Sequence, residues 1–288
     1  MPDEIQIPVT DQQAVFTQLG SPARLLAAPD AAAILPNAVA AFREDLGRIV
    51  FFDPQPRQMR GYSYAGDQVL KEDGSNLSAV LYNLTSVNGL ARKQILNFVS
   101  EIPEQPFVDL DFIVTDRRDV MVRLTESYGN RTETRDAPVL SDGTLRVLGI
   151  AAALFSARPG STVVIEEIDN GVHPSRAEAL LRNIEQMARQ RDLQVLLTTH
   201  NPALLDRLST DAIPHVVCAY RDPEDGDSRL VRLEDLPSYP ELVARGPLGQ
   251  LMTRGVLDYF LKHQESAEEK QERSQQWLET LKAQVGGP

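Results

Sequence analysis

The chain has 288 residues, of which 42% are hydrophobic and 24% are charged, and its formal net charge is −12. This length and composition allow one large domain or two ordinary domains with a sizeable core. The acidic balance disfavours nonspecific binding to nucleic acid over the whole surface, because the phosphate backbone favours cationic surfaces. No apolar run reaches the roughly 18 residues of a membrane span, and the single cysteine, Cys218, cannot form an internal disulfide. We therefore expect a cytoplasmic protein without a membrane segment.

The first part of the chain is predicted to be mainly helical. Apolar residues recur at helical spacing in three stretches, which indicates amphipathic helices. One short apolar run is instead ended by Asp53-Pro54-Gln55-Pro56 and indicates a strand. The predicted elements are a helix over 38–46, a strand over 48–52, and helices over 77–84 and 93–99. We predict that residues 1–106 form a mainly helical lid region.

A β-hairpin is predicted next. Residues 107–115 and 120–126 alternate as strands do, and residues 116–119 join them as a turn. A third strand is expected around 130–135. Arg117-Arg118 at the turn is a possible basic patch for nucleic acid, although a solvated hairpin tip is the favoured interpretation.

From Ser141 onward the pattern becomes α/β. A helix is expected over about 143–157, and a second helix over 175–190 follows Pro174. Two short, fully apolar strands, at 161–166 and 193–198, are of the kind buried in parallel sheets. The later predicted elements are a helix over 202–208, strands over 215–220 and 230–236, and helices over 256–262 and 264–284. We predict an α/β core domain over 107–262 and a charged helical tail over 263–288.

Two acids, Glu166 and Glu167, end the first apolar strand. The carboxyl edge of a parallel sheet is where α/β folds bind ligands, and successive strand residues point to opposite sides. In nucleotide hydrolysis one acid serves the magnesium shell and another orients or activates the attacking water. Glu166 fits the metal role and Glu167 the water role. The alternative is a pair of acids placed at a strand end and favoured by the dipole of a neighbouring helix.

Two further motifs flank this pair. Ser141 precedes a helix as a good cap and Gly143 permits close backbone approach, so the helix N-terminus can face an anion. An ordinary serine cap with a turn glycine is the alternative. His200 follows an apolar strand and two threonines, where it can donate to a γ-phosphate oxygen. A metal ligand or a structural histidine is the alternative for His200.

Spacing joins the three motifs. Ser141 and Glu166 are 25 residues apart, and Glu167 and His200 are 33 residues apart. Each interval has room for one helix and one strand. Both strand ends are therefore expected at the same edge of one sheet.

With these motifs the sequence resembles the ABC-type ATPases of the SMC, Rad50 and RecF group, and in particular RecF-like predicted AAA ATPases. The segments 166–175 and 198–206 carry much of the resemblance. It implies a partial P-loop NTPase fold, with ATP and Mg²⁺ as cofactors and a head-to-head dimer.

The resemblance also implies roles for individual residues. Glu166 would stand at the magnesium-linked position, Glu167 would be the catalytic base and His200 the switch histidine. Ser141, Asp142 and Gly143 would form the signature loop, which contacts the γ-phosphate of ATP bound by the opposite subunit. Asn170 would begin the loop that crosses the dimer interface and ends at His173. Asp142 replaces the second signature glycine and adds like charge there.

One element of the family pattern is missing from the sequence. No G-x-x-x-x-G-K-[ST] phosphate loop occurs in it, and that loop supplies most of the triphosphate binding. We expect the C-terminal portion of a longer ATPase, inactive by itself. The rival hypothesis is a non-catalytic regulatory subunit that supplies its signature loop to a complete ATPase partner. A homodimer or such a mixed pair is expected, and a DNA role would rest on analogy alone.

Overall fold

The computed structural model describes all residues except 1–13, 27, 88, 101–105 and 264–288. Contacts divide the chain into two compact units. The first comprises residues up to 172 together with 182–198, and the second comprises 173–181 together with the residues from 199 onward. The predicted terminal helix over 264–284 lies outside the described residues. The predicted domain bounds stay a prediction.

The first unit begins with a small helical hairpin. It contains α1 (Val15–Gln18), the 3₁₀ turn η1 (Pro22–Leu25) and α2 (Pro29–Gly47). The rings of Phe16 and Phe42 meet edge to face with their centroids 5.1 Å apart, which joins α1 to α2. Helix α2 starts nine residues before the predicted helix because Pro29 is tolerated in a first helical turn.

A parallel sheet forms the centre of this unit. Its strands are β1 (Ile49–Phe52), β6 (Thr162–Ile165) and β7 (Gln194–Leu197), in the order β1-β6-β7. The last residues of the three strands, Phe52, Ile165 and Leu197, stand in register. The sequence prediction that both apolar strands end at one sheet edge is confirmed. The strand predicted at 48–52 joins the same sheet.

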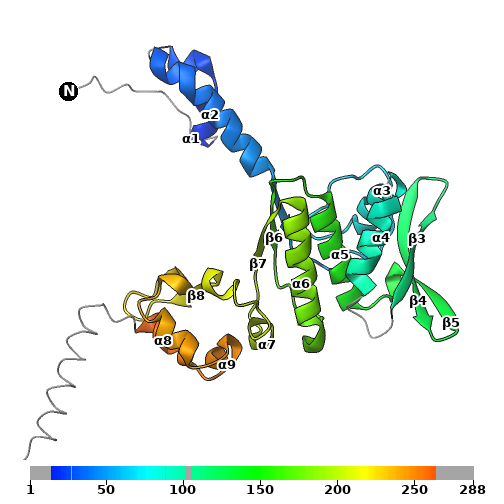
Figure 1. Ribbon diagram of the computed structural model, residues 1–288. Helices are drawn as coiled ribbons and strands as arrows, with labels where there is room; N and C mark the ends of the chain where they lie inside the picture. The colour runs from blue at the N-terminus through cyan, green and yellow to red at the C-terminus, as the bar shows by residue number, and fades with distance from the viewer. Residues whose placement is uncertain (1–13, 27, 88, 101–105, 264–288) are drawn as a thin grey trace, which may run out of the picture. The chain divides into compact units, whose positions relative to one another are not determined.

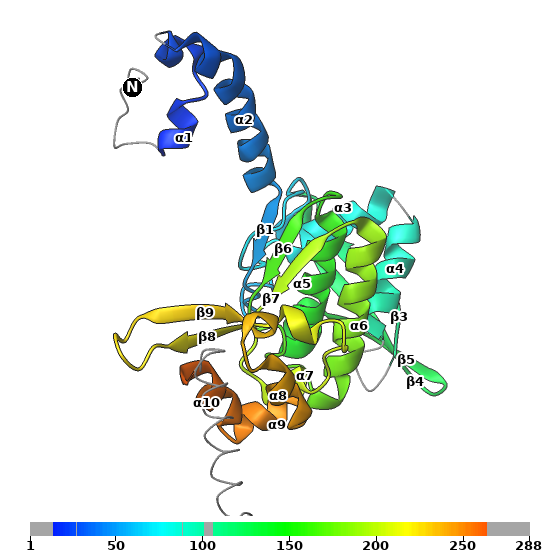
Figure 2. The ribbon, with the colours of Figure 1, turned by 60° about the vertical axis from the view of Figure 1, so that its left-hand side comes forward.

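Helices cover one face of the parallel sheet. These are α5 (Asp142–Ser156), which is buried along nearly its whole length, and the part of α6 (Pro174–Arg191) from residue 182 onward, which belongs to this unit. Figure 2 shows the sheet from its other face, with β1, β6 and β7 in front of α5. On that face the exposed fractions are 46% for Ile49, 41% for Phe51 and 52% for Leu196.

The remaining layers lie on the side of α5 away from the parallel sheet, to its right in Figure 1. Helices α3 (Leu77–Val87) and α4 (Gly89–Ser100) contact α5 on one side and an antiparallel sheet on the other. The long strand β4 (Asp119–Tyr128) is central in that sheet. Its partners are β2 (Ser63–Tyr64), β3 (Phe107–Val114) and β5 (Arg131–Asp136). The predicted hairpin and third strand are confirmed, and Arg117 and Arg118 are exposed at the hairpin tip.

The second unit has its own leucine-rich core. Eight buried residues between Leu233 and Leu261 form one apolar cluster. The elements around it are α7 (Pro202–Leu205), η3 (Ile213–His215), the hairpin β8 (Val217–Arg221) and β9 (Ser228–Arg232), η4 (Leu233–Asp235), α8 (Tyr239–Ala244), α9 (Leu248–Thr253) and α10 (Val256–Lys262). In the described part of the chain, no helix is long and apolar enough to cross a membrane.

Candidate functional site at the carboxyl edge of the parallel sheet

The carboxyl edge of the parallel sheet is continuous across its three strands. The Glu166 N–H donates to the Phe52 carbonyl at 3.0 Å, and the Thr198 N–H donates to the Ile165 carbonyl at 3.0 Å. These bonds extend the strand pairing by one residue beyond β6 and β7. Glu166 is partly exposed and Glu167 is exposed. The two predicted acids therefore stand where ligands bind in α/β folds.

Glu167 has an unusual backbone and several anchors. Its φ is +44°, in the left-handed region that non-glycine residues rarely adopt. Its N–H donates to the Thr198 hydroxyl at 3.0 Å, and the next N–H, of Ile168, donates to the Thr198 carbonyl at 3.2 Å. The Asn170 amide donates to a Glu167 carboxylate oxygen. Because such a backbone costs about 1–3 kcal/mol, it persists only where its surroundings hold it.

The turn after Glu167 packs against the loop that begins α5. Gly171 has φ +73°, and a Cβ built on Gly143 would lie 2.2 Å from the Gly171 carbonyl oxygen. Only glycine at position 143 permits this approach of two backbones. The contact brings two of the three predicted motifs together, since the signature loop meets the turn that carries Glu167 and Asn170.

Ser141 caps α5 as predicted. Its hydroxyl oxygen accepts from the Thr144 N–H at 3.1 Å, and the two hydroxyl oxygens are 2.8 Å apart. Asp142 is the first residue of the helix, and its side chain is 62% exposed. An acid in the first turn is stabilised by the helix dipole.

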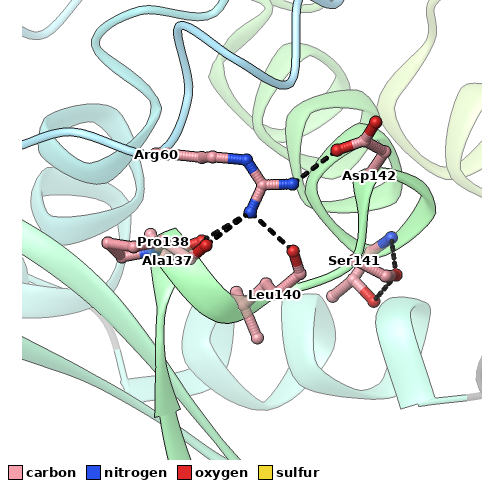
Figure 3. Close-up of polar contacts among 7 residues, drawn as sticks. Arg60, Ala137, Pro138, Leu140, Ser141 and Asp142 are labelled. Atoms are coloured by element: carbon pink, nitrogen blue, oxygen red, sulfur yellow. Dashed lines mark hydrogen bonds and ion pairs between the residues drawn. The ribbon is translucent and has the colours of Figure 1, made fainter.

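Arg60 contacts this loop and was not predicted as a site residue. Figure 3 shows its guanidinium between Asp142 and three backbone carbonyls. Nη1 lies 2.8 Å from the Pro138 oxygen, 2.7 Å from the Leu140 oxygen and 3.3 Å from the Ala137 oxygen. Nη2 lies 2.5 Å from Asp142 Oδ1. No periodicity or motif in the sequence joins Arg60 to a loop about eighty residues later.

Asp53 and Gln55 are two further residues near this edge that the prediction missed. Asp53 directly follows β1, which pairs with β6. The Gln55 amide donates to Asp53 Oδ2 at 2.9 Å. A signal existed in the sequence, since Asp53 ends its apolar strand as Glu166 ends the neighbouring one.

His200 belongs to the second unit. It is exposed and lies three residues after the end of β7. The next residue, Asn201, caps α7 by accepting from the Ala203 N–H at 2.9 Å, and its own N–H donates to the Thr199 hydroxyl at 3.0 Å. The role of His200 as a γ-phosphate sensor stays a prediction.

The acids at this edge can be compared with the ligands that metal ions take in proteins. Among the described residues, no group of three or more His, Cys, Asp or Glu side chains could hold a metal ion. Magnesium is usually bound through one or two carboxylates together with water and substrate phosphates. Glu166, with Asp53 on the neighbouring strand end, fits that requirement.

The parallel sheet, its acidic edge and the capped helix packed against it define an α/β domain of the ATPase type. The chain belongs to the family described as "AAA domain, putative AbiEii toxin, Type IV TA system", whose model matches residues 32–206. An ATP/GTP phosphatase of Helicobacter pylori (strain ATCC 700392 / 26695) is 38% identical over 73 residues, which are 24% of this chain and 20% of that protein. The match thus spans only a fifth of that curated relative.

Solved structures similar to this chain include heads of SMC proteins. The Smc head domain with coiled coil and joint from Pyrococcus yayanosii is 14% identical with a TM-score of 0.38, over 54% of this chain and 28% of that one. The SMC head domain from Thermotoga maritima is 16% identical with a TM-score of 0.34, over 53% of this chain and 50% of that one.

Proposed function

We propose that this chain supplies the water-activating and γ-phosphate-contacting part of an ATPase site. The observation that carries the proposal is the placement of Glu167. This acid stands at the sheet edge in a strained backbone, and Thr198 and Asn170 both hold it there. Residues held in sparsely populated backbone conformations cluster at active sites. Family membership gives nucleotide hydrolysis as the reaction class.

Each residue has a distinct role in this proposal. Glu167 accepts a proton from the attacking water, and Asn170 orients its carboxylate. Glu166 would hold Mg²⁺ together with the ATP phosphates, and the ion would supply charge neutralisation for the transferred phosphoryl group. Ser141 and the first N–H groups of α5 contact the γ-phosphate of ATP bound by an opposite subunit. His200 donates to a γ-phosphate oxygen in this proposal.

The triphosphate cradle comes from outside these 288 residues in this proposal, because the sequence has no G-x-x-x-x-G-K-[ST] loop. The parallel sheet has one exposed face that a further layer of structure would cover. A parallel sheet normally has both faces covered, whereas Ile49, Phe51 and Leu196 are exposed on one face of this one. In this proposal the triphosphate cradle is carried by another subunit or segment, and the chain pairs with it in a head-to-head dimer.

The test uses a Walker A-bearing segment encoded beside this chain. Reading the genomic sequence upstream of Met1 in all frames identifies the candidate segment, which is then coexpressed with the chain. We expect negligible ATP hydrolysis by the chain alone and steady turnover by the pair. Glu167→Gln should lower that turnover by about 10³-fold or more, because it removes the catalytic base. Glu185→Gln, which changes a partly exposed glutamate of α6 paired with Arg189, leaves turnover unchanged.

Two results would contradict the proposal. One is normal ATP turnover by the isolated chain that Glu167→Gln abolishes, because the cradle would then lie within it. The other is full activity of the pair after Glu167→Gln.

A regulatory subunit is the second candidate, and Asp142 in place of a signature glycine favours it. In that case the partner does the chemistry and needs only the signature loop of this chain. Ser141→Ala would then lower the partner's turnover while Glu167→Gln in this chain would not. Comparing the two variants in the same mixture separates the candidates.

A further inference from the structure

We propose that Arg60 is the positioning residue of the signature loop and that it cancels the charge of Asp142 there. The inference deepens the proposed function, since it concerns the same anion-facing loop. Its two parts are tested by separate readouts, of which one needs no ligand.

The geometry shows why the loop needs a cation. The carbonyls of Ala137, Pro138 and Leu140 converge on one point just before α5 begins. Three converging acceptors repel one another unless a donor satisfies them, and arginine provides several donors in a fixed fork. Nη1 of Arg60 occupies that point, so the guanidinium ties the 137–140 segment into one conformation (Figure 3). The conformation of this segment sets where the first turn of α5 starts.

The same side chain removes an electrostatic obstacle. Asp142 adds a negative charge in the loop where an anionic phosphate is proposed to approach. The second nitrogen of Arg60 pairs with Asp142 Oδ1 at 2.5 Å. The pair is neutral overall, so the partial positive charge of the helix N-terminus remains available to an anion. Arg60 and Asp142 together therefore replace a neutral glycine at the second signature position.

Arg60 is well placed for this because the residue before it is fixed. Met59 is 1% exposed. A Cβ on Gly149 of α5 would lie 2.6 Å from Met59 Cε, so the methionine packs directly on the helix. With its backbone anchored to α5, Arg60 loses less conformational entropy when it contacts the loop that begins the same helix.

The first readout is amide hydrogen exchange of Thr144 and Leu145 in the full chain, because both of these N–H groups donate to Ser141. Arg60→Met keeps an unbranched side chain that is somewhat shorter and removes the charge and the donors. We expect exchange at these amides to speed up at least tenfold, beyond any change at the remote amides of β3 and β4. Arg57→Met, which removes an exposed arginine three residues earlier, is the matched control and leaves the loop amides unchanged. Arg60→Met with unchanged exchange at Thr144 and Leu145 overturns the positioning role.

The second readout is the response of the Gly143 and Thr144 amide resonances to sodium tripolyphosphate at constant ionic strength. We expect Arg60→Met to weaken this response at least tenfold. The double variant Arg60→Met/Asp142→Asn restores it to within about threefold of the wild type, because the uncompensated charge is gone. A purely structural role of Arg60 predicts no such rescue, so a double variant as weak as Arg60→Met overturns charge cancellation.

The two proposals fail in different ways. If the wild-type loop amides do not respond to tripolyphosphate, the anion contact in the proposed function is wrong and charge cancellation falls with it. The exchange measurement still decides whether Arg60 positions the loop.

Discussion

Gly143→Ala tests the backbone contact that joins the signature loop to the turn after Glu167. A Cβ at position 143 would lie 2.2 Å from the Gly171 oxygen, whereas real Cβ atoms keep at least 3.0 Å from their neighbours. The backbone at Gly171 has to move by about 0.8 Å or more to reach that limit. The obstacle is backbone and not the end of a flexible side chain, so the movement disturbs the whole turn.

Two effects of opposite sign determine the result. Alanine in a helix is favoured over glycine by about 0.5–1 kcal/mol. Forced overpacking costs about 1–3 kcal/mol. We expect overpacking to win, with a net loss of roughly 0.5–2 kcal/mol. For a domain of this size, that lowers the midpoint of thermal unfolding by roughly 1–8 °C.

Differential scanning calorimetry of the transition of the first unit measures this loss. Gly89→Ala is the matched control, because Gly89 also lies in the first turn of a helix and a Cβ there would meet nothing within 4 Å. Gly89→Ala should be neutral or slightly stabilising. The reasoning is refuted if Gly143→Ala is as stable as Gly89→Ala and the amides of 169–172 exchange at the wild-type rate.

Four other predictions follow from single side chains. Glu167→Gly should leave the free energy of unfolding unchanged or raise it by up to about 1 kcal/mol in calorimetry, because glycine tolerates positive φ. Glu185→Gly in α6 should instead lower it by about 1 kcal/mol. Thr198→Val should lose about 1 kcal/mol by removing the hydroxyl that accepts from the Glu167 N–H, and Thr198→Ser should keep it; equal losses would count against this bond. Arg191→Met should destabilise the first unit by about 1–3 kcal/mol in urea unfolding, because Arg191 satisfies two carbonyls at the end of α5. Burial raises the pKa of Cys218 from 9.0 to about 11. At pH 8 its thiol should therefore react with a disulfide reagent about 100-fold more slowly in the folded protein than in denaturant. Equal rates would show that the thiol is accessible.

The local elements of this fold were predictable because their signals are local. The strands around 161–166 and 193–198 are short apolar runs, and the helix over 143–157 has an apolar stripe with a serine cap. The structure places β6, β7 and α5 there. Strand β2 was missed because it has only two residues, and the segment around it has no period.

The contacts within the site were much less predictable. That Glu167 would stand at a sheet edge follows from its place after an apolar strand. The contacts of Glu167 with Thr198 and Asn170 could not be predicted, because both depend on a turn whose φ values no sequence pattern specifies. Arg60 is the clearest case, since its partners lie 77 to 82 residues later in the chain. A side chain that satisfies converging carbonyls leaves no trace in the sequence around either partner.

The strain at Glu167 bears on the choice between a catalytic and a regulatory chain. Glycine or asparagine at this position would adopt a φ of +44° at little cost, so the fold itself does not require glutamate there. Glutamate brings only the carboxylate, which Asn170 orients by a hydrogen bond from its amide. A subunit that supplied only the signature loop would need Gly143 and Arg60 but would have no use for an oriented carboxylate in a strained turn. The energetic cost carried by Glu167 therefore favours the hypothesis in which this chain activates water in its own ATPase site.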